Sequence, residues 1–292
     1  MKVLVTGSTG GIGTYVVKRL LEAGHFLRAF DIPAQPKVDD YEYIAGDVRD
    51  LALLRRAAHG MDAVVHLAAI PYDVERQDEL VLDTNLRGTW NVLLASHEAG
   101  VKRVVSFSSI NALGQGEPNH PGLYLPLDDD VPHYSVHNYP LTKHVGEEMC
   151  AAFAARGGFS AISLRPTLVT HPGPSRYRWW DFLPEDFKLQ SNIGDFWSYV
   201  DVRDVAEAAL LSLTAPVEKH QAFLLACDEN RTRTPTAEIV EKHYAHLPWP
   251  KISKADYLAR GEFIGLLDCG AAKRVLGWQP RYNRFDPSAG YE

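Results

Sequence analysis

The chain has 292 residues, 46% of them hydrophobic and 23% charged, which suits one large soluble domain or one domain with a smaller lobe. Its 30 Lys and Arg residues against 37 Asp and Glu residues give a formal net charge of −7, which argues against nucleic-acid binding as the main function. Every apolar stretch is too short for a signal peptide or a membrane span, so we expect a cytoplasmic protein with no membrane association. The three cysteines, Cys150, Cys227 and Cys269, have no metal-ligand spacing, so we expect them to be reduced and to bind no metal.

Short apolar runs alternate with helical patterns through the first two-thirds of the chain. Strands are predicted over residues 2–7, 26–31, 41–47, 63–69, 103–109 and 159–167. Helices are predicted over residues 12–23, 51–60, 79–99 and 140–156. Because strands that alternate with helices are joined by crossover connections, this order predicts an α/β fold with a Rossmann-type, doubly wound parallel sheet.

The alternation breaks after the strand at 159–167. Residues 172–187 are rich in proline, aromatic and charged residues, which is typical of a loop or small lobe. A turn leading into a helix is predicted over 199–213, a late strand over 222–228, and short helices with irregular chain over 235–292. We predict a dinucleotide-binding Rossmann domain from residues 1–168 plus 199–228, and a small C-terminal substrate-binding lobe from residues 169–198 plus 229–292.

The segment VTGSTGGIG (residues 5–13) places Gly7, Gly10 and Gly13 three apart, between a predicted strand and a predicted helix. Without a Cβ, glycine lets the backbone approach a pyrophosphate, and the free N–H groups at the helix N-terminus then face its negative charge. The segment therefore predicts a dinucleotide-binding loop.

Two aspartates follow neighbouring predicted strands. Asp31 ends the second strand, 21 positions after Gly10, where a carboxylate can accept hydrogen bonds from both adenosine ribose hydroxyls and would repel a 2′-phosphate. Because no Arg or Lys follows closely, Asp31 favours NAD over NADP. Asp47 ends the third strand, where the adenine edge would be reached. A capping or turn role is the alternative for each aspartate.

The segment NYPLTKHVGEE (138–148) contains Tyr139 and Lys143, four residues apart and so on one face of a predicted helix. A lysine ammonium beside a tyrosine hydroxyl favours the phenolate, so the tyrosine can exchange a proton nearer neutral pH. Ser109, at the end of the fifth predicted strand, could hydrogen-bond the same substrate oxygen. Each residue alone is equally well a surface or capping side chain, but in this order after a glycine loop they predict hydride transfer with a dinucleotide.

Taken together, these motifs resemble the extended short-chain dehydrogenase/reductase group, the NAD-dependent epimerase/dehydratase family. The resemblance covers nearly the whole chain and includes VTGSTGGIG, GDV (46–48), VVHLAA (64–69), DTNLRGTWNVLLA (83–95), FSSINALG (107–114), YPLTK (139–143), LRPTLV (164–169), YVDVRDVAEA (199–208) and KRVLGWQP (273–280). It implies that Tyr139 is the acid/base with Ser109 as its partner, and that Lys143 binds the nicotinamide ribose and lowers the tyrosine pKa. The residues implied to line the cofactor are Gly7, Gly10, Gly11, Ile12, Gly13, Asp31, Asp47, Val48, Leu67, Ala68, Ala69, Asn85, Lys143 and Pro166. It also implies a homodimer that packs the Asn85 and Tyr139 helices against their copies.

Where the sequence departs from the family pattern, some reactions of the family become less expected. Dehydratases of the family carry a threonine, an aspartate and a glutamate where this chain has Ser109, Ile110 and Asn111, so dehydration is not expected. Nucleotide-sugar epimerases carry a longer insert where this chain has NIGDFW (192–197) and no obvious nucleotide clamp. The chain is more similar to compact sugar or uronate dehydrogenases, which implies NAD-dependent oxidation of a free sugar or sugar acid. A nucleotide-sugar epimerase is the alternative, and a non-catalytic NAD sensor would not need the intact acid/base set.

Substrate contacts are indicated only weakly. An arginine in the small lobe could bind a substrate carboxylate, and polar side chains near the strand ends could bind sugar hydroxyls, although a solvated loop is an equally good reading. The candidates are Tyr72, Asn111, Arg176 and Arg178. His66 has apolar neighbours on its strand, so we expect a packed histidine rather than a base.

Overall fold

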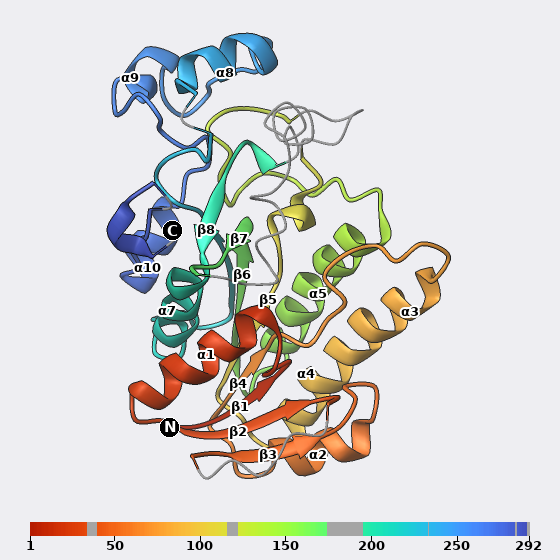
Figure 1. Cartoon of the computed structure of the whole chain (residues 1–292). Coiled ribbons are helices and arrows are strands. Elements are labelled where there is room, and N and C mark those ends of the chain that lie inside the picture. Colours follow the sequence, from red (N-terminus) through yellow and green to blue (C-terminus); the bar gives the residue numbers. More distant parts are fainter. Residues whose placement is uncertain (34–39, 116–121, 174–194, 233, 284, 291–292) are drawn as a thin grey trace.

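Seven parallel strands form the central sheet of this computed structural model, which describes residues 1–33, 40–115, 122–173, 195–232, 234–283 and 285–290 (Figure 1). The strands are β1 (Lys2–Thr6), β2 (Phe26–Asp31), β3 (Glu42–Ala45), β4 (Ala63–His66), β5 (Arg103–Phe107), β6 (Ser160–Pro166) and β9 (His220–Leu225). Their order across the sheet is β3-β2-β1-β4-β5-β6-β9, and each pair of neighbours is parallel. The predicted doubly wound α/β fold is confirmed, with the strand order reversing between β1 and β4.

Helices cover both faces of the sheet. The helices α1 (Gly11–Glu22) and α7 (Val202–Ser212) pack together on one face, and α2 (Leu51–Ala58), α4 (Gly88–Glu98) and α5 (Asn138–Ala155) cover the other (Figure 1). Alternate side chains of β1 separate the two cores: Val3 and Val5 belong to the cluster under α1 and α7, and Leu4 to the cluster under α2, α4 and α5. None of the helices in the described ranges is long and apolar enough to cross a bilayer.

The helix predicted over residues 79–99 is divided into three parts. The segment α3 (Asp78–Leu82) continues into the π-helical turn η1 (Asp83–Arg87) and then into α4. Within η1, the amide of Asn85 hydrogen-bonds the backbone of Ile70 in both directions. Just beyond it, a Cβ on Gly88 would lie 2.6 Å from a methyl of Val48, so this helix approaches the β3–α2 loop closely. Long-range contacts of this kind set the local winding, and no helical period reports them.

The last third of the chain forms a second, two-stranded parallel sheet and several short helices. The pair β7 (Leu168–Thr170) and β8 (Tyr199–Asp201) lies directly before α7, where the sequence predicts only a turn. The short elements that follow β9 are α8 (Thr236–His243), α9 (Lys254–Leu258), α10 (Gly270–Leu276) and the 3-10 turn η5 (Pro287–Ala289). In Figure 1, α8 and α9 lie beyond the top end of the central sheet, while α10 lies beside α7.

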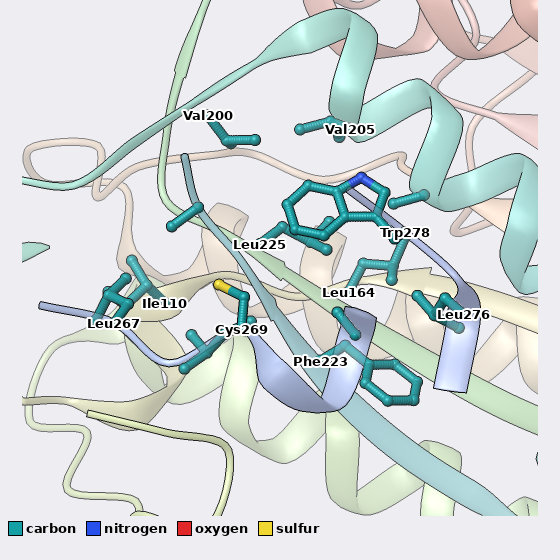
Figure 2. Close-up of a cluster of buried hydrophobic side chains, with 14 of the residues drawn as sticks. Ile110, Leu164, Val200, Val205, Phe223, Leu225, Leu267, Cys269, Leu276 and Trp278 are labelled. Atoms are coloured by element: carbon teal, nitrogen blue, oxygen red, sulfur yellow. The ribbon is translucent and has the colours of Figure 1, made fainter. Parts of the chain in front are cut away.

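The C-terminal segment is anchored to α7 and the sheet rather than forming a separate core. Trp278 is fully buried among Leu164, Phe223 and Val205, as Figure 2 shows, and its indole N–H donates to the carbonyl of Asp204 at 2.8 Å. The carboxylate of Asp204 accepts the backbone N–H groups of residues 281 and 282 at 3.0 Å. The predicted division into a Rossmann domain and a lobe stays a prediction, with part of the predicted lobe packed into the first core.

Candidate active site

The carboxyl ends of β1, β4, β5 and β6 open onto a pocket of about 510 Å³. The pocket lies where the strand order reverses, the position at which doubly wound sheets bind their ligands. Most of the predicted site residues line it: Gly7, Gly10, Gly11, Ile12, Gly13, Leu67, Ala69, Ser109, Asn111, Tyr139, Lys143 and Pro166. The tertiary structure thus brings the glycine loop and the predicted acid/base residues into one cavity.

The glycine loop is a tight backbone turn that only glycine fits. Gly7 has a φ of 70°, and a Cβ on it would lie 2.6 Å from the backbone nitrogen of Ala68. A Cβ on Gly13 would overlap the carbonyl oxygen of Gly7. The N-terminus of α1 has no side-chain cap and no acidic residue in its first turn, and the buried hydroxyl of Ser8 has no hydrogen-bond partner among the described residues. These features fit a dinucleotide pyrophosphate held by backbone N–H groups.

Asp31 ends β2 as predicted, but most of its carboxylate is engaged by the protein. One oxygen accepts the backbone N–H and the hydroxyl of Thr9 at 2.8 and 2.7 Å, and the other accepts the backbone N–H of Ile32 at 2.8 Å. A carboxylate has about four acceptor positions, so about one remains for a ligand. Asp31 therefore anchors the glycine loop, and its hydrogen bonds to the ribose hydroxyls stay a prediction.

Asp47 and Val48 lie outside the pocket. Arg49 pairs with Asp47 through its Nε at 3.0 Å and its Nη2 at 2.6 Å, and this hydrogen-bonded ion pair lowers the pKa of Asp47. Val48 is buried against Gly88. An adenine contact for Asp47 stays a prediction. Arg49 was not expected as the partner of Asp47, although it follows Asp47 by only two residues.

Asn85 is buried, and it does not line the main pocket, so its cofactor contact stays a prediction. Its carbonyl oxygen accepts the N–H of Ile70 at 2.8 Å, and its amide nitrogen donates to the carbonyl of Ile70 and to the Thr142 hydroxyl, each at 3.0 Å. The side chain therefore ties the segment after β4 to α5. Together with Ala68 it lines a small cavity under Lys143 instead of the main pocket.

Tyr139 and Lys143 project from α5 into the pocket beside the end of β5. The helix begins where Asp73 accepts the backbone N–H of Tyr139 at 2.7 Å. The ammonium nitrogen of Lys143 lies 5.7 Å from the centre of the Tyr139 ring and donates to the carbonyl of Phe107 at 2.7 Å. The hydroxyl of Ser109 accepts the backbone N–H of Asn111 at 3.2 Å and hydrogen-bonds Tyr139.

The surroundings of Tyr139 set its protonation in this structure. Burial raises the pKa of Tyr139 to about 12, with Asp73 adding to the rise, whereas the hydrogen bond to Ser109 lowers it. The ammonium of Lys143 donates to the carbonyl of Phe107, and its lowering of the Tyr139 pKa stays a prediction. The phenol is therefore protonated at neutral pH in this structure.

Of the residues predicted to contact substrate, only one lines the pocket in the described part of the chain. Asn111 is exposed and lines the pocket, whereas Tyr72 is 62% exposed and lies outside it; Arg176 and Arg178 fall outside the described residues. Other residues that line the pocket were not predicted as site residues, among them the polar residues Ser108, Thr167, His171 and Asp195. A short strand read from LVT (168–170) would have pointed to His171, which directly follows it.

His66 is a packed histidine, as predicted. Its ring nitrogens hydrogen-bond the hydroxyls of Thr6 at 2.7 Å and Thr89 at 3.1 Å. Burial, with a smaller contribution from the charge of Lys143, lowers the pKa of His66 to about 3. The ring is therefore neutral and holds β1 against α4.

Known proteins provide a second line of evidence. Sterol demethylase protein B of Methylococcus capsulatus is 29% identical to this chain, over 97% of this chain and 86% of its own length. Uronate dehydrogenase of Pseudomonas putida is 29% identical over 89% of this chain and 88% of its own length. The solved structure of MoeE5 with UDP-glucuronic acid and NAD is similar with a TM-score of 0.70 and 24% identity, over 97% of this chain and 95% of that one. These names do not share one substrate.

The family evidence is broader than any single relative. The sequence model described as the NAD dependent epimerase/dehydratase family matches residues 3–226, about three-quarters of the chain. This match confirms the predicted family, the enzyme class and NAD as the cofactor. Its range contains the glycine loop, Ser109, Tyr139 and Lys143. The chain therefore belongs to the NAD-dependent epimerase/dehydratase family.

Proposed function

We propose that the protein oxidises a free sugar or sugar acid with NAD, and that Tyr139 is the acid/base. The observation that carries this proposal is the single pocket in which the glycine loop, Ser109, Tyr139 and Lys143 meet. When bound, NAD supplies the hydride acceptor, and its positively charged ring adds to the ammonium of Lys143 in favouring the phenolate. The glycine loop and the N-terminus of α1 would hold the pyrophosphate.

The chain's own residues then handle one proton. Tyr139 accepts the hydroxyl proton of the substrate in oxidation and returns one in reduction, and Ser109 hydrogen-bonds the same oxygen. Since the buried phenol has a pKa of about 12, it is ready to donate at neutral pH, and oxidation requires added positive charge near it. Oxidation should therefore speed up as the pH rises until Lys143 loses its proton.

The sugar assignment is supported by the uronate dehydrogenases among the relatives and by the polar side of the pocket. Asn111 and His171 line the pocket together with Tyr139, at positions where hydroxyl or carboxylate groups could bind. Arg176 and Arg178 remain proposed carboxylate ligands. The apolar residues Leu67, Ile110 and Leu168 line the rest of the cavity.

A substrate panel tests this proposal directly. The purified protein is mixed with NAD and a set of free aldoses and uronic acids, and NADH absorbance is followed. We expect steady NADH accumulation with at least one of them. Absence of NADH combined with a change of configuration in a nucleotide sugar would replace the proposal with the epimerase alternative. NADH formed only from a sterol or another apolar alcohol would overturn the sugar assignment while leaving the tyrosine chemistry in place.

Cofactor preference is tested at Asp31. We expect Asp31→Asn to raise the ratio of kcat/KM with NADP to kcat/KM with NAD by roughly tenfold, because the amide no longer repels a 2′-phosphate while it still accepts the Thr9 hydrogen bonds. Asp62→Asn is the matched control, since Asp62 also accepts a backbone N–H, at the opposite end of β1. An unchanged ratio in Asp31→Asn would show that this carboxylate does not select the cofactor.

A further inference from the structure

A buried ion pair lies directly behind Lys143. Glu147 follows Lys143 by four residues on α5, and its side chain is 3% exposed. One of its carboxylate oxygens accepts the Ser108 hydroxyl and the Nε of Arg165 at 2.9 Å, and the other accepts the Nη2 of Arg165 at 2.6 Å. The Arg165 side chain is itself 5% exposed. A two-point ion pair this deep in the protein is held with little freedom.

The pair joins three elements that form the wall of the active site. Glu147 belongs to α5, Arg165 to β6, and Ser108 directly follows β5 and precedes the proposed catalytic Ser109. Lys143 and Glu147 line the same cavity of about 10 Å³ beneath the main pocket. Because residues four apart on a helix lie on one face, the carboxylate of Glu147 is the nearest acidic neighbour of Lys143 on this helix.

Burial and the neighbouring acidic groups shift the pKa of Lys143 in opposite directions. Burial lowers the pKa of Lys143 to about 8, and Glu147 opposes that shift, as does Cys150 to a smaller degree. His66 on β4 is neutral. The other titratable groups of the surrounding elements are Asp73, Tyr139, His171 and Asp195 around the main pocket, and Asp129, His133, His144, Arg165 and His220 around Glu147.

We propose that Glu147 is a positioning residue for the reaction: its negative charge, fixed by Arg165 and Ser108, keeps the Lys143 side chain in the ammonium form beneath Tyr139. The inference rests on the proposed role of Lys143. Near neutral pH, a buried lysine without this neighbour would lose its proton, along with the positive charge that favours the phenolate. A purely structural ion pair would instead affect the stability of the fold and leave the protonation of Lys143 unchanged.

The test measures Lys143 itself. Protein labelled with ¹³C at the lysine ε-carbon is titrated by NMR, and the Lys143 signal is assigned by its absence in Lys143→Arg. Glu147→Gln removes the charge while keeping the size and one acceptor oxygen, which can still serve Ser108 and the Nε of Arg165, whereas the Nη2 of Arg165 loses its acceptor. We expect the Lys143 titration midpoint to fall by at least about one pH unit. Glu148→Gln removes the same charge from the adjacent, exposed residue and should leave the midpoint where it is in the wild type.

Two further variants keep the result interpretable. Glu147→Asp retains the charge, so it should restore the Lys143 midpoint even if the shorter side chain weakens the contact with Arg165. If the single variant fails to fold, the double variant Glu147→Gln with Arg165→Gln removes both buried charges together, which avoids leaving one uncompensated. Because the loss of the Arg165 cation by itself raises the Lys143 midpoint, the double variant is compared with Arg165→Gln and should titrate lower. A Lys143 midpoint in Glu147→Gln equal to that of the wild type, or in the double variant equal to that of Arg165→Gln, would overturn the proposal.

A binding measurement gives an independent readout. The affinity for NAD of Glu147→Gln is measured by calorimetry across the same pH range, and its decline at high pH should begin about one pH unit earlier than in the wild type. Neither measurement needs a sugar. A failed substrate panel with a shifted Lys143 midpoint would therefore reject the proposed substrate and retain the role of Glu147.

Discussion

Replacing Tyr139 by Phe is expected to lower kcat by about 10²–10⁴-fold while NAD affinity stays close to that of the wild type. The change removes the only atom of this side chain that can exchange a proton, and the buried ring keeps its place at the start of α5. Steady-state kinetics with the sugar identified by the panel, together with calorimetric titration of NAD, measures both quantities. The expected pattern is a lost chemical step with an intact cofactor site.

The control for this experiment is Tyr134→Phe. Tyr134 is 49% exposed and precedes α5 in the chain, so the same loss of a hydroxyl occurs outside the pocket. Turnover by Tyr134→Phe should equal that of the wild type. Unreduced turnover by Tyr139→Phe would remove the tyrosine from the mechanism and favour a protein that retains NAD without using this acid/base set.

The second large effect is expected at Gly13. In Gly13→Ala the new methyl overlaps the carbonyl oxygen of Gly7, so the glycine loop has to move away from its present path. Forcing such an overlap costs about 1–3 kcal/mol, which corresponds to roughly ten- to hundredfold weaker NAD binding if the loop opens to relieve it. Calorimetric titration with NAD and a thermal melt check the loss of affinity and of stability.

Gly146→Ala provides the matched comparison. Gly146 is also a helical glycine, but a Cβ added there meets no heavy atom within 4 Å. The exchange should stabilise α5 by about 0.5–1 kcal/mol through the lower backbone entropy of alanine in the unfolded chain, with NAD affinity unchanged. Equal NAD affinity in both alanine variants would show that the tight turn is not what holds the cofactor.

Local patterns were sufficient to predict the sheet and to single out Tyr139 and Lys143, which both line the pocket. The continuous apolar run of β1, the glycines after it and the four-residue spacing of Tyr139 and Lys143 are features of a few adjacent residues. The carboxyl ends of parallel strands meet along one edge of a sheet, so predicted strand ends at Gly7 and Ser109 implied a shared pocket. The structure brings both into it.

The partners of polar side chains were harder to predict. Asp31, Asp47 and Asn85 were expected at the cofactor, yet Thr9 engages most of the first carboxylate, Arg49 pairs with the second, and Ile70 holds the amide. A carboxylate or amide bonds whichever partners lie within about 3 Å. Thr9 and Ile70 come from other segments of the chain, whereas Arg49 lies only two residues after Asp47.

The sequence by itself determined the order of elements, the glycine loop and the candidates for the acid/base residues, because each depends on periodicity or on residues adjacent in the chain. Only the tertiary structure decided the protonation of Tyr139 and the ion pair between Glu147 and Arg165. The pKa of a side chain depends on how much water burial removes and on which charges end up beside it. Both are set when α5, β5 and β6 pack together, because segments that are distant in the sequence then replace water around each side chain.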